Sequence, residues 1–116
     1  MIRHQGEFKT ELRERMRGGS GSVTIEHFWE PGTELKAKTR LCARLTLPPG
    51  ASIGFHEHKA EEEVYVILRG EGAVEENGQA LPVKAGDSVL TGNGAGHAIA
   101  NTGAGPLEIL AFIAQY

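Results

Sequence analysis

The sequence lacks the features that define several protein classes. Cys42 is the single cysteine among 116 residues, which excludes an internal disulfide. No apolar run approaches the roughly 20 residues of a membrane span, and the charged stretch 1–17 has no apolar segment of a signal peptide. Twelve basic and fifteen acidic residues give a net charge of −3, which offers no basic surface for nucleic acid. We therefore expect a cytoplasmic protein that binds neither nucleic acid nor a membrane.

Glycine is the residue in excess. The chain has 16 glycines, about twice the usual share, and its 40% of hydrophobic residues lie in short stretches between them. A chain of this length can bury about two-thirds of its unfolded surface, which supports one core and no second domain. The composition indicates many short elements joined by tight turns, and it excludes a helical bundle.

The interior of the chain has the periodicity of strands. Apolar and polar side chains alternate over 23–30 and 40–47, and the second stretch ends at Pro48-Pro49-Gly50. The continuous apolar run 64–68 is typical of a strand covered on both faces, and Asn77-Gly78 signals a hairpin. No interior segment has the length and period of a crossover helix, so the sequence predicts an all-β sandwich or barrel. Further short strands are expected at 80–84, 88–91, 97–101 and 107–114.

The first 22 residues differ in character from the rest. They are polar and end in a glycine- and serine-rich stretch, 18–22. Phe8, Leu12 and Met16 recur at helical spacing, which indicates a short amphipathic turn, although the same residues can lie extended along a barrel wall. We expect an N-terminal arm over 1–22 and one barrel domain over 23–116.

Three histidines and one glutamate have the spacing of a metal site. His56 and His58 are two residues apart in an expected strand and so project from one face. Glu63 can bring a carboxylate to the same point from the neighbouring strand, and His97 follows a glycine loop, 92–96. Imidazole and carboxylate together suit a divalent transition metal ion, namely Mn, Fe, Ni, Zn, Co or Cu. The alternative is that the His-x-His pair only lies on an exposed edge strand.

The longer spacing resembles the two motifs of the cupin superfamily. The first motif is GASIGFHEHKAEEEVYVILRG over 50–70, and the second is GDSVLTGNGAGHAIAN over 86–101, where Gly92 stands in place of the usual proline. This resemblance implies a small jelly-roll barrel, a double-stranded β-helix, and a homodimer. It also implies that one metal ion is bound by His56, His58, Glu63 and His97.

Within the superfamily, the sequence is most similar to small single-domain bacterial cupins called oxalate-decarboxylase-like. The segments LPPGASIGFHEH and LRGEGAVEENG carry this similarity. True oxalate decarboxylases are larger two-cupin proteins with an arginine three residues before the first ligand histidine, where this sequence has Ile53. The resemblance therefore does not extend to the arginine with which those enzymes bind the substrate carboxylate.

Several residues near the motifs are candidates for further roles. Three consecutive glutamates precede the apolar run, and strand parity places Glu61 on the face of Glu63, with Glu62 as the fallback ligand. Tyr65 shares that face and is a candidate substrate-facing group, with ordinary core packing as the alternative. The catalytic candidates are thus Tyr65 and Arg44.

For the remaining candidate residues, an ordinary structural role is the alternative to a functional one. Arg40 or Arg44 can supply an anion-binding group, although surface placement is the default for arginine. Cys42 shares their face and is expected to pack as a small hydrophobe. His4 and His27 are expected at the surface or in packing. Phe28 and Trp29 lie on opposite faces of one strand, so a second subunit can cover one of them.

Two main functions fit these observations. The first is a metal-dependent enzyme, of lyase, dioxygenase or isomerase type, that acts on a small carboxylate-bearing or oxygen-rich metabolite. The alternative is a non-catalytic sensor or binding module for a small molecule, because no acid, base or nucleophile beyond the ligands can be assigned. A third is an interaction protein whose metal only stabilises the fold.

Overall fold

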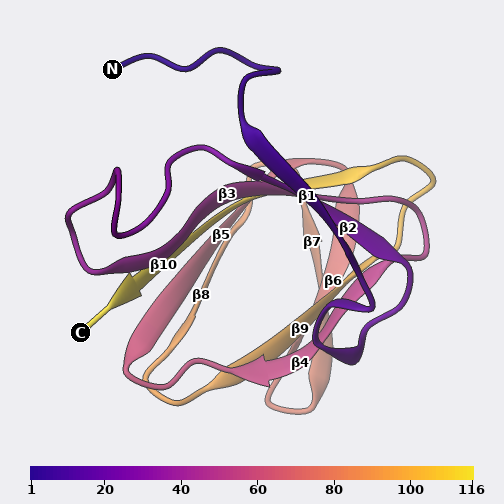
Figure 1. Cartoon of the computed structure of the whole chain (residues 1–116). Coiled ribbons are helices and arrows are strands. Elements are labelled where there is room, and N and C mark those ends of the chain that lie inside the picture. The colour runs from indigo at the N-terminus through magenta and orange to yellow at the C-terminus, as the bar shows by residue number, and fades with distance from the viewer.

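The chain folds into two facing antiparallel β-sheets (Figure 1). The structure is a computed structural model and describes residues 1–116. It confirms the all-β prediction, since the single helical element is one turn of 3₁₀ helix. None of its helical segments has the length and hydrophobicity of a membrane span. The elements are β1 (Lys9–Glu14), η1 (Met16–Gly18), β2 (Ser22–His27), β3 (Thr39–Leu47), β4 (Ser52–Glu57), β5 (Glu61–Arg69), β6 (Glu71–Glu76), β7 (Gln79–Lys84), β8 (Ser88–Gly92), β9 (Gly96–Asn101) and β10 (Leu107–Gln115).

The core lies between the two sheets. The larger sheet has the order β1-β2-β3-β10-β5-β8, and the smaller has the order β4-β9-β6-β7. Central strands follow the predicted alternation, because β10 buries every second side chain and leaves the others partly exposed. Fourteen buried hydrophobic residues from both sheets form one cluster. Such a cluster is the single core expected of a chain of this length.

The predicted strands agree with the structure except at their ends. β2 ends at His27 instead of residue 30, because the chain turns into a loop in which the Glu30 carbonyl accepts hydrogen bonds from the amides of Glu34 and Leu35. β5 begins at Glu61, three residues before the apolar run. The three consecutive glutamates therefore lie within the strand, and their side chains alternate between its two faces.

The first residues of the chain lie along the barrel wall. Lys9–Glu14 form β1, which pairs antiparallel with β2 and makes one edge of the larger sheet. The extended alternative therefore describes Leu12, whereas Met16 begins the helical turn and packs against the core. Phe8 packs edge-on against Phe28, with 5.1 Å between ring centroids. The turn η1 that follows β1 lies against strand β4.

The turn η1 approaches β4 at backbone distance. A Cβ atom on Gly54 would collide with the carbonyl oxygen of Arg17, and one on Gly19 would collide with the carbonyl of Ser52. Only glycine permits this approach, because any side chain would need the space that the opposite backbone fills. The two glycines thus fix the height of η1 above β4.

We predict that Gly54→Ala destabilises the protein by about 1–3 kcal/mol, because the added methyl group overpacks this contact. Gly105→Ala is the matched control, since a Cβ there meets nothing within 4 Å and its φ is not positive. The control should be neutral or up to about 1 kcal/mol more stable. Urea unfolding measures both free energies of unfolding, and equal values for the two variants would contradict the assigned contact.

Candidate metal centre

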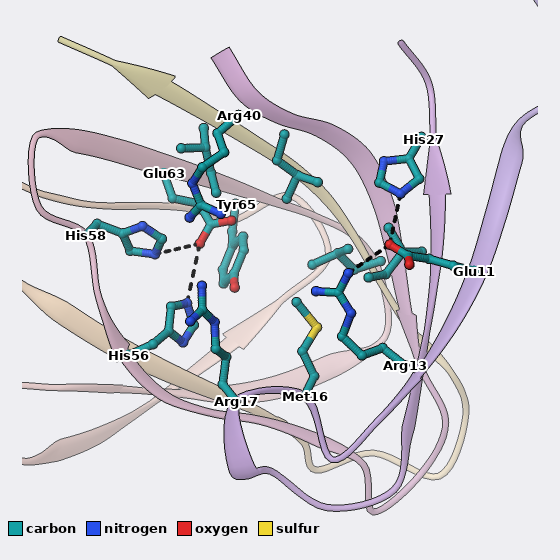
Figure 2. Close-up of a pocket in the computed structure, with 14 residues that line it drawn as sticks. Glu11, Arg13, Met16, Arg17, His27, Arg40, His56, His58, Glu63 and Tyr65 are labelled. Carbon is teal, nitrogen blue, oxygen red and sulfur yellow. Dashed lines mark hydrogen bonds and ion pairs between the residues drawn. The ribbon is translucent and has the colours of Figure 1, made fainter. Parts of the chain in front are cut away.

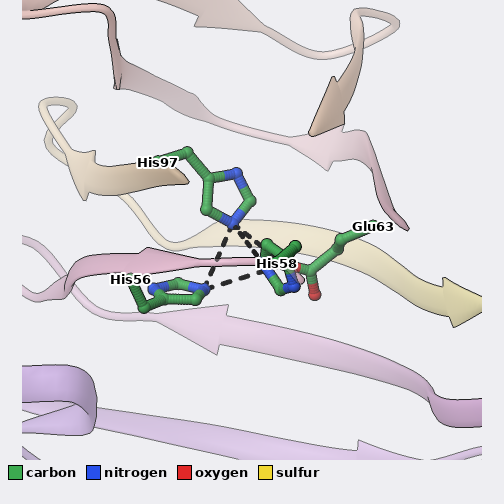
Figure 3. A group of neighbouring side chains, drawn as sticks. All are labelled: His56, His58, Glu63 and His97. Carbon is green, nitrogen blue, oxygen red and sulfur yellow. Dashed lines mark hydrogen bonds and ion pairs between the residues drawn. The ribbon is translucent and has the colours of Figure 1, made fainter. Parts of the chain in front are cut away.

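The strand register brings the four predicted ligands together from both sheets (Figure 3). His56 lies in β4 directly opposite His97 in β9, and His58 follows the end of β4. Glu63 comes from β5 in the other sheet, where it pairs with Thr91 of β8. The candidate ligand atoms of all four side chains lie within 4.8 Å of one another. The cluster therefore connects the two sheets.

The spacing of these atoms fits the coordination shell of one ion. The Nε2 atom of His97 is 3.1 Å from Nε2 of His58 and 3.2 Å from Nε2 of His56. Glu63 Oε1 lies 3.0 Å from Nε2 of His97, 3.0 Å from that of His58 and 3.9 Å from that of His56. With bonds of about 2.1 Å, neighbouring ligands of a six-coordinate ion are about 3.0 Å apart, and those of a tetrahedral ion about 3.4 Å. The donor set and its spacing thus suit one divalent metal ion.

The outer nitrogen of each imidazole has its own partner. His56 Nδ1 donates to the carbonyl oxygen of Gly54 at 2.7 Å, and His58 Nδ1 donates to the Glu61 carboxylate at 2.5 Å. His97 Nδ1 lies 2.9 Å from the Thr91 hydroxyl. Because a carbonyl and a carboxylate only accept, His56 and His58 carry their proton on Nδ1. Their Nε2 lone pairs therefore face each other and the Glu63 carboxylate, an arrangement that a cation stabilises.

Glu63 is ionised although it is buried. Its side chain is 3% exposed, and burial raises the pKa of a carboxyl group. Donation from imidazole N–H groups to this carboxylate outweighs burial and holds the pKa of Glu63 at about 2, and a metal cation in place of those protons would act in the same direction. The centre therefore presents a fixed negative charge to a metal ion.

A second layer of side chains orients His58, and sequence reasoning missed it. Arg40 donates two hydrogen bonds of 2.8 Å to the Glu61 carboxylate, which holds the pKa of Glu61 at about 2. Arg40 reaches Glu61 because it is the extra residue of a β-bulge, in which Leu41 pairs with Ile113 and the next pair joins residues 39 and 114. Glu61 thus stays available as the ionised acceptor of the His58 proton.

A cavity of about 150 Å³ lies beside the cluster (Figure 2). His56, His58, Glu63 and Tyr65 line one side of it. Tyr65 is buried and stacks on His97, with 4.9 Å between centroids and 12° between planes. Burial and the Glu63 charge raise the pKa of Tyr65 well above its usual range, so its hydroxyl stays protonated. The rest of the wall comes from β1, η1 and the larger sheet, including Glu11, Arg13, Met16, Arg17, His27 and Arg40.

The other candidate residues lie away from the metal cluster. Arg44 does not reach the cavity but pairs with Glu26 at 2.9 Å, because its neighbours Ala43 and Leu45 occupy the inward face of β3. Glu62, the fallback ligand, is exposed and points away from the cluster. His27 lines the cavity and lies 3.1 Å from Glu11, a position that sequence reasoning missed. Cys42 and Trp29 are half-buried, and His4 is exposed.

The fold and this centre define a class of protein. Residues 43–113 match the family profile described as Cupin domain, and the chain therefore belongs to the cupin family. This confirms the resemblance drawn from the two motifs.

Comparison with individual proteins narrows the similarity within that family. The chain is 44% identical over 113 residues to the oxalate-binding protein of Thermotoga maritima. The aligned region covers 97% of this chain and 93% of that protein. Its structure resembles the crystal structure of a predicted oxalate decarboxylase from Thermotoga maritima, with a TM-score of 0.89, 42% identity and 100% coverage of both chains. A polyketide cyclase from Streptomyces resistomycificus has the same fold at 19% identity and a TM-score of 0.78, covering 99% of this chain and 79% of the cyclase.

We predict that Glu61→Gln weakens metal binding about 10- to 100-fold, because a neutral amide orients the His58 imidazole less well. Glu62→Gln is the matched control: the same change at the neighbouring, exposed position should leave affinity unchanged. Calorimetric titration of Mn²⁺ or Zn²⁺ into the metal-free variants measures both affinities. A loss from Glu61→Gln no larger than that from Glu62→Gln would contradict the orienting role of Glu61.

Proposed function

We propose that the protein binds one divalent transition metal ion through His56, His58, Glu63 and His97 and uses it to bind a small carboxylate-bearing metabolite. The observation that carries the proposal is that His56 and His58 are held by their Nδ1 atoms, so that their Nε2 atoms meet that of His97 beside one buried carboxylate. Mn, Fe, Ni, Zn, Co and Cu all suit this mixed donor set. When bound, the ion supplies Lewis-acid charge and coordination positions that the four side chains leave open.

The cavity supports a small acid as the ligand. A volume of about 150 Å³ holds a molecule of about six non-hydrogen atoms, which is the size of oxalate. Arg17 lines the cavity without a carboxylate partner and favours an anion. The protonated Tyr65 hydroxyl can donate a hydrogen bond to a ligand oxygen. The name of the Thermotoga relative, an oxalate-binding protein, agrees with this class of ligand.

Two uses of such a site are proposed. The coordination positions that four protein ligands would leave open on a bound ion favour a metal-dependent enzyme of lyase, dioxygenase or isomerase type. A different observation favours a non-catalytic sensor or binding module: Glu11, which lines the cavity, and Glu61, which contacts His58, are both paired with arginines. Neither is free to act as a general acid or base.

Two sequence-based predictions remain part of this proposal. The protein is expected in the cytoplasm, and it is expected to form a homodimer. Strand β1 lies at the edge of the larger sheet, and the unpaired backbone groups of such an edge can pair with a strand of a second subunit.

We predict that the His56→Ala/His58→Ala double variant loses stoichiometric metal binding, because it removes two of the four donors. Elemental analysis of protein purified without a histidine tag measures the metal content. Loading wild-type protein at 100 times its dissociation constant should raise the free energy of unfolding by about 2.7 kcal/mol. Full metal content in the double variant would overturn the ligand assignment, and a metal that changes stability but no ligand binding would favour a purely structural role.

We predict that metal-loaded protein binds oxalate and that metal-free protein does not, as measured by isothermal titration calorimetry. The same preparations, incubated with oxalate and a library of small carboxylates and sugars, distinguish the two uses. Product formation by loaded protein, absent from the double variant, would establish an enzyme. Tight binding without turnover of any compound would establish the sensor or binding module, and no binding at all would contradict the proposed ligand class.

A further inference from the structure

Three arginines line the cavity, and two of them already have carboxylate partners. Arg13 pairs with Glu11 at 2.9 Å, and Arg40 is held by both oxygens of Glu61. Arg17 forms no ion pair with any carboxylate of the chain. It is therefore the cavity cation whose hydrogen-bond donors are free for a ligand.

The backbone holds Arg17 at the edge of the candidate metal centre. Its carbonyl lies against Gly54, the same residue whose own carbonyl accepts the proton of His56 Nδ1. Arg17 adopts a left-handed conformation with φ of 54°, which an L-residue adopts only when its surroundings impose it. Figure 2 shows its guanidinium beside His56, directed toward the space shared by Glu63 and Tyr65. One glycine thus positions both the imidazole and the arginine.

We propose that Arg17 is the residue that selects the ligand's charge: it binds the outer carboxylate oxygens of a small dianion held at the metal centre. This inference rests on the proposed function. The planar guanidinium fork matches two oxygens at once, so a ligand with two outer oxygens gains more from Arg17 than a ligand with one. The buried Ile53 at the third position before His56 offers no charge of its own, which leaves the anion contact to the N-terminal segment.

The cavity restricts this selection to short acids. Oxalate and glycolate are close in size, and each can chelate a metal ion through two oxygens. Oxalate then retains two outer oxygens and a second negative charge, whereas glycolate retains one outer oxygen. A cavity of about 150 Å³ has room for a ligand of about six non-hydrogen atoms and favours oxalate over bulkier dicarboxylates. The expected ligand is therefore a two-carbon dianion, or one of nearly that size.

Calorimetric titration of oxalate and of glycolate into Mn²⁺-loaded protein tests the assignment. Arg17→Gln should weaken oxalate binding about 10- to 100-fold, the loss expected for hydrogen bonds to a charged group, and glycolate binding by much less. Arg15→Gln is the matched control, because Arg15 also has a positive φ, is exposed and does not line the cavity. It should bind both acids like wild type. The melting temperature should be the same in all three proteins, because Arg17 is exposed, and each should bind one equivalent of Mn²⁺, because Arg17 contributes no metal ligand.

The outcomes separate this inference from the proposed function. If wild-type protein binds oxalate and Arg17→Gln binds it equally well, or loses oxalate and glycolate to the same extent, the role of Arg17 is overturned and the proposed function stands. If loaded wild-type protein binds neither acid, both are overturned. Arg17→Lys, which keeps the charge but loses the fork, should lie between wild type and Arg17→Gln for oxalate.

Discussion

The candidate metal centre depends on protons that point away from it. Gly54 and Glu61 accept the Nδ1 protons of His56 and His58, and Thr91 contacts Nδ1 of His97. These partners come from both sheets: Gly54 lies in β4, whereas Glu61 and Thr91 lie in β5 and β8. The relative position of the sheets therefore determines where the imidazole lone pairs meet, and the buried core that holds the sheets together also determines the ligand geometry.

The same arrangement links the centre to the stability of the barrel. Lone pairs and a carboxylate about 3 Å apart repel one another unless a cation or a proton lies between them. A metal ion removes this repulsion and cross-links the sheets, since His56 and His97 belong to one sheet and Glu63 to the other. Metal binding and folding are therefore expected to favour each other.

Sequence reasoning predicted the four clustered residues because the information lies in spacing and in alternation along strands. Every second residue of a strand shares a face, so Glu61 and Glu63 are correctly placed inward and Glu62 outward. Alternation along the strand did not distinguish Arg40 from Arg44, because it places both side chains on the same face, whereas in the structure only Arg40 lines the cavity. The bulge that turns Arg40 inward depends on the pairing of β3 with β10, which no local pattern shows. The position of the first 22 residues stayed open for the same reason, because pairing with β2 decides between helix and strand.

The cavity is built from two parts of the chain that are separate in sequence. Every clustered histidine and glutamate lies between residues 56 and 97, within the segment that matches the cupin family, whereas the facing wall of β1 and η1 precedes that segment. Substitutions in residues 9–19 can therefore change the shape and charge of the cavity while the metal donors stay intact. Chains with the same metal motif can accordingly accept different small molecules, and exchanging this one segment between them offers a direct route to redesigning ligand preference.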